Sequence, residues 1–323
     1  MQKVLGLGNA LVDILIRLED DKLLEEFSLP KGSMQLTGPE TAHKIMNKAK
    51  GLETTISSGG SAANTINGLA RLGISTGYIG AICKDKYGGY FQSGLEEFKT
   101  KTYFNYRETG TGIATALITP DSERTFATYL GAALELDASM IKEEQFMGYA
   151  YLHFEGYLVP NHELVEKALL MAHKNGVKTS IDMASYNIVE ENIDFLKKII
   201  KEHVDIVFAN EDEAKALTGK EPEDALNEIA RMCEIAVVKI GKEGSLIKQG
   251  EYFSKTGVID VHSVDTTGAG DLYAAGFLYG LIHKLPLGEC GRIASILSGK
   301  VIEVIGSKMN DKCWNEIKEM ISH

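Results

Sequence analysis

Short apolar runs alternate with longer runs of helical periodicity along most of this chain. Six short runs, rich in β-branched or apolar residues, predict strands: Lys3–Leu7, Tyr78–Ile82, Ala150–Phe154, Val177–Ile181, Asp205–Phe208 and Ala236–Ile240. The intervening or following segments with 3.6-residue periodicity predict helices: Ala62–Leu72, Asn161–His173, Ile193–Lys201, Pro222–Met232, Gly270–Lys284 and Leu287–Ile305. Continuous apolar strands separated by helices are typical of a mostly parallel sheet covered on both faces. We therefore expect an α/β fold, organised as a single domain over residues 1–323.

Two stretches break this alternation. In the first, the strand-like runs Ile14–Leu18 and Ser33–Leu36 flank a short acidic helix. The second contains strand patterns without helices: Tyr103–Arg107, Gly112–Thr119 and Thr125–Leu130, with a turn at Pro120-Asp121-Ser122. They predict a small sheet, formed by about 14–38 and 102–130, that stands off the main body. Such a sheet serves either as a lid that excludes water from a site or as a plain surface excursion.

Composition narrows the class of function. The 323 residues are 44% hydrophobic and 24% charged, which is typical of a globular protein, and the net charge of −11 argues against a nucleic-acid partner. The four cysteines form no CxxC pair, which favours reduced thiols. The sequence contains no run of about 18 apolar residues, the length that a membrane-spanning helix needs. We expect a cytoplasmic location and no membrane partner.

The stretch Asp265-Thr-Thr-Gly-Ala-Gly-Asp271 comes directly before an apolar helix. A glycine-rich turn that opens a helix points free backbone N–H groups the same way, at the positive end of the helix dipole, and so can bind an anion. Asp271 falls in the first helical turn, where a carboxylate can accept a proton from an attacking hydroxyl. On local grounds alone, an acid that merely stabilises the helix dipole remains the alternative.

Other motifs in the chain fail to support rival classes of enzyme. No Gly-x-x-x-x-Gly-Lys-Ser/Thr occurs, and Gly6-Leu-Gly-Asn-Ala-Leu11 lacks the third glycine of a dinucleotide fingerprint. Ser61 lacks the closing glycine of a hydrolase elbow, and His162 lacks a second histidine at the spacing of a zinc helix. These observations exclude a P-loop enzyme and disfavour a dehydrogenase, a hydrolase and a histidine-ligated metal site.

Two long motifs resemble those of the ribokinase family, the PfkB carbohydrate kinases that include adenosine kinases. Residues 265–277 resemble the C-terminal signature, and Gly59-Gly-Ser-Ala-Ala-Asn64, continuing to Gly73, resembles the N-terminal one. The resemblance covers essentially the whole chain. It implies a ribokinase-like three-layer sandwich with a small β-sheet lid, and an ATP-dependent kinase. It further implies that Asp271 is the catalytic base and that Gly268, Ala269 and Gly270 form the anion hole.

The second signature supplies polar groups for a sugar. Asn64 has both donor and acceptor capacity, and Asp13, at the far end of the first strand, can accept two hydroxyl hydrogen bonds. The resemblance implies that Asn9, Asp13, Gly59, Gly60 and Asn64 hold the sugar hydroxyls. Apart from it, Asn64 would be a residue at a helix start and Asp13 an ordinary acid at a strand end. The part played by Glu155 stays open.

The nucleotide end is marked by two further motifs. Asn210-Glu-Asp-Glu213 resembles the motif whose glutamate, Glu213, orders Mg²⁺ through its water shell, and it also reads as an N-capped acidic turn. Lys239-Ile-Gly-Lys-Glu-Gly-Ser245 resembles a nucleotide-binding turn in which Gly241 and Gly244 let the backbone approach ATP. Lys239 stands where the family usually has a smaller residue. Arg124 resembles an arginine that adenosine-kinase-like members bring towards the phosphates, or it is an exposed arginine of a turn.

The substrate is predicted less sharply than the reaction. The segments Gly6–Asp13 and Asp20–Phe27 resemble adenosine-kinase-like members, and four side chains could form an apolar slot for a base: Met34, Leu36, Phe126 and Tyr129. We therefore expect a nucleoside such as adenosine, with a free sugar such as ribose or fructose, or a non-catalytic nucleotide-binding protein, as alternatives. K⁺ near Asp265 and Gly306, and pairing of two copies through the lid, rest on resemblance alone.

Overall fold

The computed structural model describes residues 2–121 and 123–322, and its centre is a nine-stranded sheet with the order β14-β13-β12-β11-β10-β9-β1-β5-β6. The strands are β1 (Lys3–Leu7), β5 (Ser75–Cys83), β6 (Lys101–Arg107), β9 (Tyr151–Glu155), β10 (Lys178–Asp182), β11 (Ile206–Asn210), β12 (Ile235–Lys239), β13 (Ser245–Gln249) and β14 (Tyr252–Thr256). Within this order, the neighbours from β12 through β11, β10, β9, β1 and β5 to β6 pair in parallel. β13 pairs antiparallel with both β12 and β14. The predicted α/β fold with a mostly parallel central sheet is confirmed.

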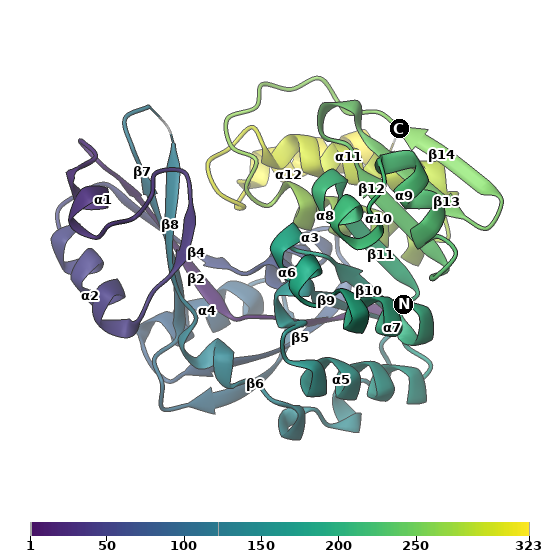
Figure 1. Cartoon of the computed structure of the whole chain (residues 1–323), viewed down its shortest axis with the longest axis horizontal. Coiled ribbons are helices and arrows are strands. Elements are labelled where there is room, and N and C mark those ends of the chain that lie inside the picture. The colour runs from purple at the N-terminus through teal and green to yellow at the C-terminus, as the bar shows by residue number, and fades with distance from the viewer. Residues whose placement is uncertain (1, 122, 323) are drawn as a thin grey trace.

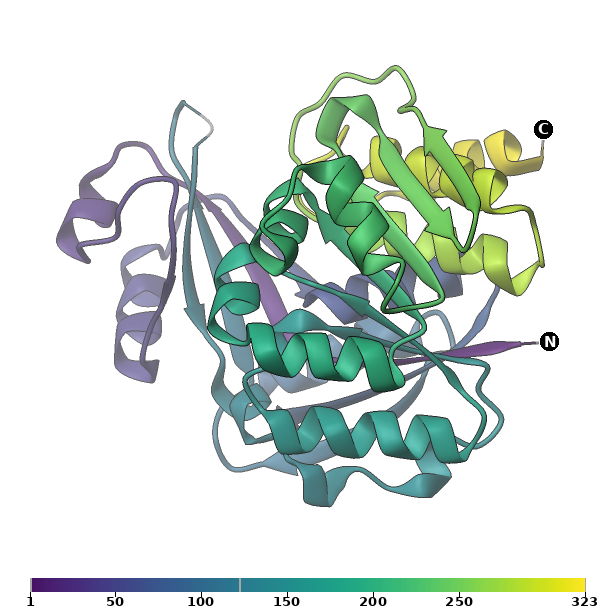
Figure 2. The ribbon, with the colours of Figure 1, turned by 45° about the vertical axis from the view of Figure 1, so that its right-hand side comes forward.

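Helices cover both faces of this sheet, as Figures 1 and 2 show. One face carries α3 (Ser61–Arg71), α4 (Lys86–Glu96), α10 (Ala269–Ile282), α11 (Leu287–Val301) and α12 (Asp311–Ser322). The other carries α5 (His162–Lys174), α6 (Tyr186–Glu191), α7 (Ile193–His203), α8 (Glu211–Thr218) and α9 (Pro222–Ile229). Neighbouring strand residues such as Val207 and Phe208 point to opposite faces and join two separate hydrophobic cores. This double burial explains why the strands are apolar at consecutive positions.

A five-stranded sheet with the order β3-β8-β7-β2-β4 stands beside the main body, at the left of Figure 1. It consists of β2 (Leu11–Arg17), β3 (Met34–Leu36), β4 (Thr54–Gly59), β7 (Gly112–Ile118) and β8 (Arg124–Tyr129), with α1 (Lys22–Glu26) and α2 (Pro39–Lys48) packed against it. Ile14 and Ile16 of β2 pack with Ile45 of α2 in one apolar cluster. One face of the small sheet is therefore buried and the other is left for the rest of the molecule.

Three expectations about this region need correction. Tyr103–Arg107 does not belong to the small sheet, because β6 pairs in parallel with β5 at the edge of the large one. The small sheet instead gains β4, whose polar sequence Thr-Thr-Ile-Ser-Ser-Gly hid its strand character. Asp13 lies inside β2, not at the end of the first strand. Of the predicted turn, Pro120 and Asp121 form a turn, and Ser122 lies outside the described residues.

Short 3-10 segments complete the chain: η1 (Gly131–Glu135), η2 (Ala138–Met140), η3 (Glu143–Gln145), η4 (Gly156–Leu158) and η5 (Gly241–Glu243). Across residues 2–121 and 123–322, none of the helices combines the length and apolar character that crossing a membrane requires. The polar ends of β9, β10, β11 and β12, namely Glu155, Asp182, Asn210 and Lys239, fall on one edge of the sheet. Ligands of open α/β sheets bind outside the carboxyl ends of the strands, so this edge is where a site is expected.

Candidate active site

The start of α10 forms the centre of this edge. Gly268 precedes the helix in the left-handed conformation, with φ of +78°, and a Cβ added there would lie 2.9 Å from Cβ of Ser307. The Ala269 N–H donates to the carbonyl of Thr266 (3.2 Å), whereas within the described residues the N–H groups of Gly268 and Gly270 have no protein acceptor. Two of the three predicted anion-hole donors are thus free at the positive end of the helix dipole.

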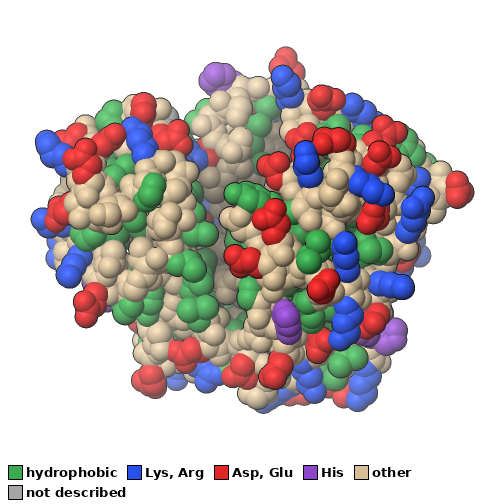
Figure 3. Space-filling model, in the orientation of Figure 1, with side chains coloured by type: hydrophobic (Ala, Val, Ile, Leu, Met, Phe, Trp, Pro, Cys, Tyr) green, Lys and Arg blue, Asp and Glu red, His purple; other side chains and the backbone are tan. Residues whose placement is uncertain are grey.

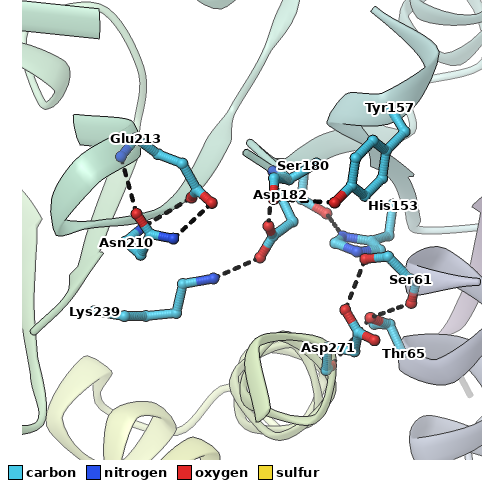
Figure 4. Close-up of polar contacts among 11 residues, drawn as sticks. Ser61, Thr65, His153, Tyr157, Ser180, Asp182, Asn210, Glu213, Lys239 and Asp271 are labelled. Carbon is cyan, nitrogen blue, oxygen red and sulfur yellow. Dashed lines mark hydrogen bonds and ion pairs between the residues drawn. The ribbon is translucent and has the colours of Figure 1, made fainter. Parts of the chain in front are cut away.

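Asp271 lies in the first turn of α10 and faces α3 (Figure 4). Its Oδ1 accepts a hydrogen bond from Ser61 Oγ (2.7 Å), and its Oδ2 accepts one from Asn64 Nδ2 (2.9 Å). The hydroxyl of Thr65 donates to the backbone carbonyl of Asp271 (3.0 Å), which fixes one helix against the other. The two signatures, about 200 residues apart in sequence, are therefore joined by direct hydrogen bonds.

The environment of Asp271 suits a proton acceptor. Burial raises its pKa to about 6; the hydrogen bonds from Ser61 and Asn64 favour the ionised form, and the charge of Asp182 opposes it. A carboxyl group with such a pKa is ionised at neutral pH and is a stronger base than an exposed aspartate. A helix-dipole acid would not need two side-chain donors from another helix.

Ser61 contributes to the site in a way that the sequence did not indicate. Its hydroxyl orients Asp271, and among the described residues no histidine bonds to it, which argues against a hydrolase nucleophile. A local signal exists in hindsight, because Ser61 and Asn64 stand three positions apart and share one face of α3. Ser307 was also missed; its Oγ donates to Asn64 Oδ1 (3.0 Å) and so fixes the orientation of that amide.

The sugar-binding residues predicted from the N-terminal signature lie together. A Cβ on Gly59 would collide with the carboxylate of Asp13, and one on Gly60, where φ is +88°, would collide with the backbone carbonyl of Asn9. These glycines let β2, β4 and the start of α3 approach closely. Burial and the nearby charge of Asp271 raise the pKa of Asp13 to about 7, which Lys308 opposes.

Glu155 has a structural part in this arrangement. The side chain is 1% exposed, and it accepts hydrogen bonds from the Asn9 N–H (2.9 Å), Asn9 Nδ2 (2.7 Å) and the Ala62 N–H (2.9 Å). Both carboxylate oxygens thus have protein donors, and burial raises the pKa of the group to about 7. Glu155 positions Asn9 and caps the start of α3.

A cavity of about 880 Å³ opens on the other side of the α10 N-terminus. Asn210, Gly241, Gly244, Ala269 and Gly270 all line it, so the predicted nucleotide-binding turn and the anion hole share one space. Both turn glycines have positive φ, +52° and +95°. A volume of this size suits a nucleotide, since ligand pockets commonly span about 300–1,000 Å³.

Arg124 reaches from the small sheet towards the same helix start. Its guanidinium forms an ion pair with Asp265 and donates from Nη1 to the hydroxyl of Thr267 (3.1 Å). Asp265 in turn accepts the backbone N–H groups of Thr267 (2.8 Å) and Gly306. Among the described residues, the buried Nε of Arg124 has no hydrogen-bond partner. This arginine is therefore placed beside the glycine-rich turn and is not an exposed residue of a loop.

The comparisons with known proteins agree with this geometry. Residues 32–312 match the family model described as "pfkB family carbohydrate kinase". The chain belongs to this family. It is an ATP-dependent kinase of the carbohydrate and nucleoside class.

Solved structures and a curated relative from this family resemble the kinase over much of its length. An adenosine kinase from Sinorhizobium meliloti is 32% identical, with a TM-score of 0.88 and 99% of both chains covered. A probable sugar kinase from Rhizobium etli is 31% identical, with a TM-score of 0.89, covering 99% of this chain and 98% of the other. The guanosine-inosine kinase of Escherichia coli is 30% identical over 67% of this chain and 53% of its own length. The likeness to nucleoside and sugar kinases is nearly equal.

In this PfkB kinase, strand register decides which side chains of the small sheet face the site. Asp13 pairs with Ala114, Ala114 with Thr128, and Thr128 with Leu36, so these residues share one face. Met34 and Phe126 pair with each other and stand two positions before Leu36 and Thr128 on their strands, so they lie on the same face as those residues. Tyr129 pairs with Ile113 and points to the opposite face, so its proposed place in the base slot is wrong.

The residues of the metal motif are arranged as an N-cap. Asn210 Oδ1 accepts from the Glu213 N–H (2.9 Å), while both Glu213 oxygens accept from Asn210, through its N–H (2.8 Å) and its Nδ2 (2.7 Å). Glu213 is 2% exposed, and burial raises its pKa to about 7. Its neighbours Glu211 and Asp212 line the cavity. Because both oxygens of Glu213 are bonded to Asn210, Glu213 is not placed as a direct ligand, and its action on Mg²⁺ through the water shell stays a prediction.

Proposed function

We propose that this kinase phosphorylates a hydroxymethyl group of a nucleoside, with adenosine as the first candidate, and that Asp271 is its general base. The observation that carries the proposal is the Asp271 carboxylate. It lies between the free N–H groups of the α10 start and the polar cluster of Asn9, Asp13 and Asn64. Phosphate and hydroxyl can meet only where these two regions adjoin.

The proposed reaction follows from this placement. The substrate hydroxyl takes the place of Ser61 or Asn64 at the carboxylate and forms a bond to the terminal phosphorus of ATP. The bond from that phosphorus to the β–γ bridging oxygen breaks, ADP leaves, and the hydroxyl proton passes to Asp271. The N–H groups of Gly268 and Gly270 stabilise charge on the transferring group, and Arg124 adds a positive charge. When Mg²⁺ is bound, it neutralises phosphate charge.

The apolar face of the small sheet supports a nucleoside. Met34 and Leu36 are 50% and 66% exposed, and the half-buried Phe126 lies beside Met34 on the face that also carries Asp13. Figure 3 shows a hollow between the lobe of the small sheet and the main body, with hydrophobic side chains along its wall. A base would bury these side chains, whereas a free sugar would leave them in water.

A free sugar such as ribose or fructose is the second candidate. It is supported by the near-equal likeness to the probable sugar kinase of Rhizobium etli. Closure of the small sheet as a lid, a K⁺ site near Asp265 and Gly306, and pairing of two copies through the small sheet remain predictions. The carboxylate of Asp265 already accepts donors from Thr267, Gly306 and Arg124, so an ion there would have to share it.

The direct test is coupled ADP release with magnesium and ATP across purine nucleosides, pyrimidine nucleosides, ribose and fructose. We expect the highest kcat/KM with a purine nucleoside. A clear preference for a free sugar would transfer the assignment to the second candidate. If none of these acceptors stimulated ADP release while ATP still bound, both candidates would fail and the alternative of a non-catalytic nucleotide-binding protein would be favoured.

A further inference from the structure

Lys239 occupies a distinctive position at the edge of the main sheet. It ends β12 and lines the 880 Å³ cavity together with Ala269 and Gly270. Its side chain is 17% exposed, and its Nζ donates to Asp182 Oδ2 (2.7 Å), which belongs to a side chain that is 7% exposed. A lysine so far removed from water is costly unless its charge is used or compensated.

The ammonium group lies against the first turn of α10. A Cβ placed on Gly270 would stand 3.1 Å from Lys239 Nζ and 3.8 Å from Asp182 Oδ2. Figure 4 shows Lys239 extending along this helix end towards Asp182. Within the described residues, Asp182 is the one hydrogen-bond acceptor of an ammonium that carries three donors. An anion held by the Gly270 N–H therefore lies next to unused N–H bonds of Lys239.

The charge balance around Lys239 points to the same role. Asp182, Glu213 and Asp271 surround Lys239, and their negative charges raise the pKa of its ammonium despite its burial. None of these three acids lines the cavity, whereas Lys239 does, so a triphosphate bound there would meet the positive member of this group. If Lys239 served only as the counter-ion of Asp182, it would not need to line the cavity, because the counter-ion of a buried acid can lie away from a ligand site.

We propose that Lys239 is a cationic ligand of the transferring phosphoryl group and that Asp182 is the positioning residue that aims it. The proposal rests on the assignment of Asp271 and the α10 N-terminus as the centre of phosphoryl transfer. Lys239 keeps its proton throughout the reaction, while the proton of the substrate hydroxyl goes to Asp271. Lys239 belongs to the main sheet, whereas Arg124 is carried by the small sheet.

The first test compares Lys239→Met with Lys239→Arg, and uses Lys248→Met as a control. Lys248, on the neighbouring β13, bonds Asn227 and is outside the cavity wall. We expect Lys239→Met to lower kcat by about 10²–10³-fold with KM for the acceptor within about threefold, because a donor to the reacting phosphoryl group is lost. Lys239→Arg should restore part of kcat, and Lys248→Met should match the parent.

Binding gives a readout that does not depend on turnover. Lys239→Met should weaken a non-hydrolysable ATP analogue at least about tenfold and leave ADP nearly unchanged, because only the triphosphate reaches the α10 N-terminus. Calorimetric titration of folded protein measures both constants. Equal losses for both nucleotides, or a kcat equal to the parent in a variant with a lowered melting temperature, would mean that Lys239 is a structural ion-pair partner and would overturn the proposal.

The pH profile separates the two residues of the pair. The charged groups that face Asp271 are Asp13 of β2, Glu155 of β9, Asp182 of β10 and Lys239 of β12. Asp182 raises the pKa of Asp271 and Lys239 lowers it. The acid limb of kcat should therefore move to higher pH in Lys239→Met and to lower pH in Asp182→Asn. Shifts in the same direction, or none, would contradict the proposal.

The outcomes distinguish this inference from the assignment on which it rests. If Asp271→Asn kept full turnover, the proposed base would be wrong, whatever Lys239 did. If Asp271→Asn abolished turnover while Lys239→Met retained the kcat and pH profile of the parent, only the role of Lys239 would fail.

Discussion

The two walls of the site are built differently. On the main-sheet side, Asp271, Lys239 and Asp182 are fixed by hydrogen bonds between regular elements, and the surrounding side chains are buried. On the small-sheet side, Met34 and Leu36 lie half or more exposed on a three-residue edge strand. The groups proposed for the chemistry are thus preorganised, while the surface proposed to meet the rest of the substrate is left open to water.

This contrast separates the groups proposed for the chemistry from those proposed to select the acceptor. Groups that stabilise a transition state must be held in place before the substrate arrives. Groups that select a substrate can remain exposed and gain binding energy by being covered. We expect substitutions on the main-sheet wall to change turnover, and substitutions on the small-sheet wall to change which acceptor is used.

The largest effect is expected for Asp271→Asn. Asparagine keeps the shape of the side chain and cannot accept the hydroxyl proton, so kcat should fall by about 10²–10⁴-fold while ATP still binds. Steady-state ADP release and calorimetric ATP titration measure the two properties. The matched control is Glu163→Gln, which removes an exposed acid from the first turn of α5.

Near-parent turnover in Asp271→Asn would remove the contrast between the two walls, because Asp271 would then be no more than a helix-dipole acid. An equal loss in Glu163→Gln would point to a general effect on folding. Circular dichroism of both variants checks that the fold is retained.

A smaller and more selective effect is expected for Phe126→Ala. Stacking of a base on an aromatic side chain contributes about 1–3 kcal/mol, so kcat/KM for the nucleoside should fall roughly 5–150-fold. Turnover of a free sugar, which makes no such contact, should change little. The control is Tyr129→Ala, which removes an aromatic side chain from the same strand on the opposite face.

Parallel losses for nucleoside and free sugar in Phe126→Ala would mean that Phe126 supports the strand and not the base. The same would follow if Tyr129→Ala reproduced the nucleoside-specific loss. Kinetic constants for one nucleoside and for ribose, measured with each variant, decide between these outcomes.

The sequence predicted the main sheet well because burial on both faces gives an unambiguous apolar pattern. Six strands of the main sheet matched their predicted runs to within a few residues: β1, β5, β9, β10, β11 and β12. The small sheet was harder to predict. β4 is polar, and Tyr103–Arg107 reads as a strand but nothing local says which sheet it joins. Strand pairing is a long-range property that one sequence does not display.

In the site, too, residues in local motifs were predicted, and residues defined by contacts distant in sequence were missed or misplaced. Asp271 and Asn64 lie in signatures, and the structure brings them together at 2.9 Å. Asp182 was missed because a lone acid at a strand end looks like any other. Tyr129 was misplaced because alternation along β8 depends on its register with β7. The contacts of Glu155 with Asn9 and Ala62 join three elements distant in sequence.

The smallest expected effect is on the free energy of unfolding. It follows from the carboxyl groups of Asp271 and Asp13, which lie between the two walls. Burial raises the pKa of Asp271 to about 6 and that of Asp13 to about 7, in each case from 3.8. The folded protein therefore binds more protons than the unfolded chain between about pH 4 and 7, so these groups destabilise it as the pH rises through this window. Both carboxyl groups are partly accessible, and a cost of about 1–3 kcal/mol each is expected at pH 8.

Asp271→Asn and Asp13→Asn should accordingly raise the melting temperature of the ligand-free protein at pH 8 and have little effect near pH 4. The control, Asp121→Asn, has the opposite sign, because hydrogen bonds from Thr119 and Lys31 lower the pKa of Asp121 to about 2. Its removal should cost stability at neutral pH and none at very low pH. Melting curves across this range test whether the carboxyl groups of Asp271 and Asp13 oppose folding. A gain that was constant with pH in Asp271→Asn would show that charge burial is not its cause.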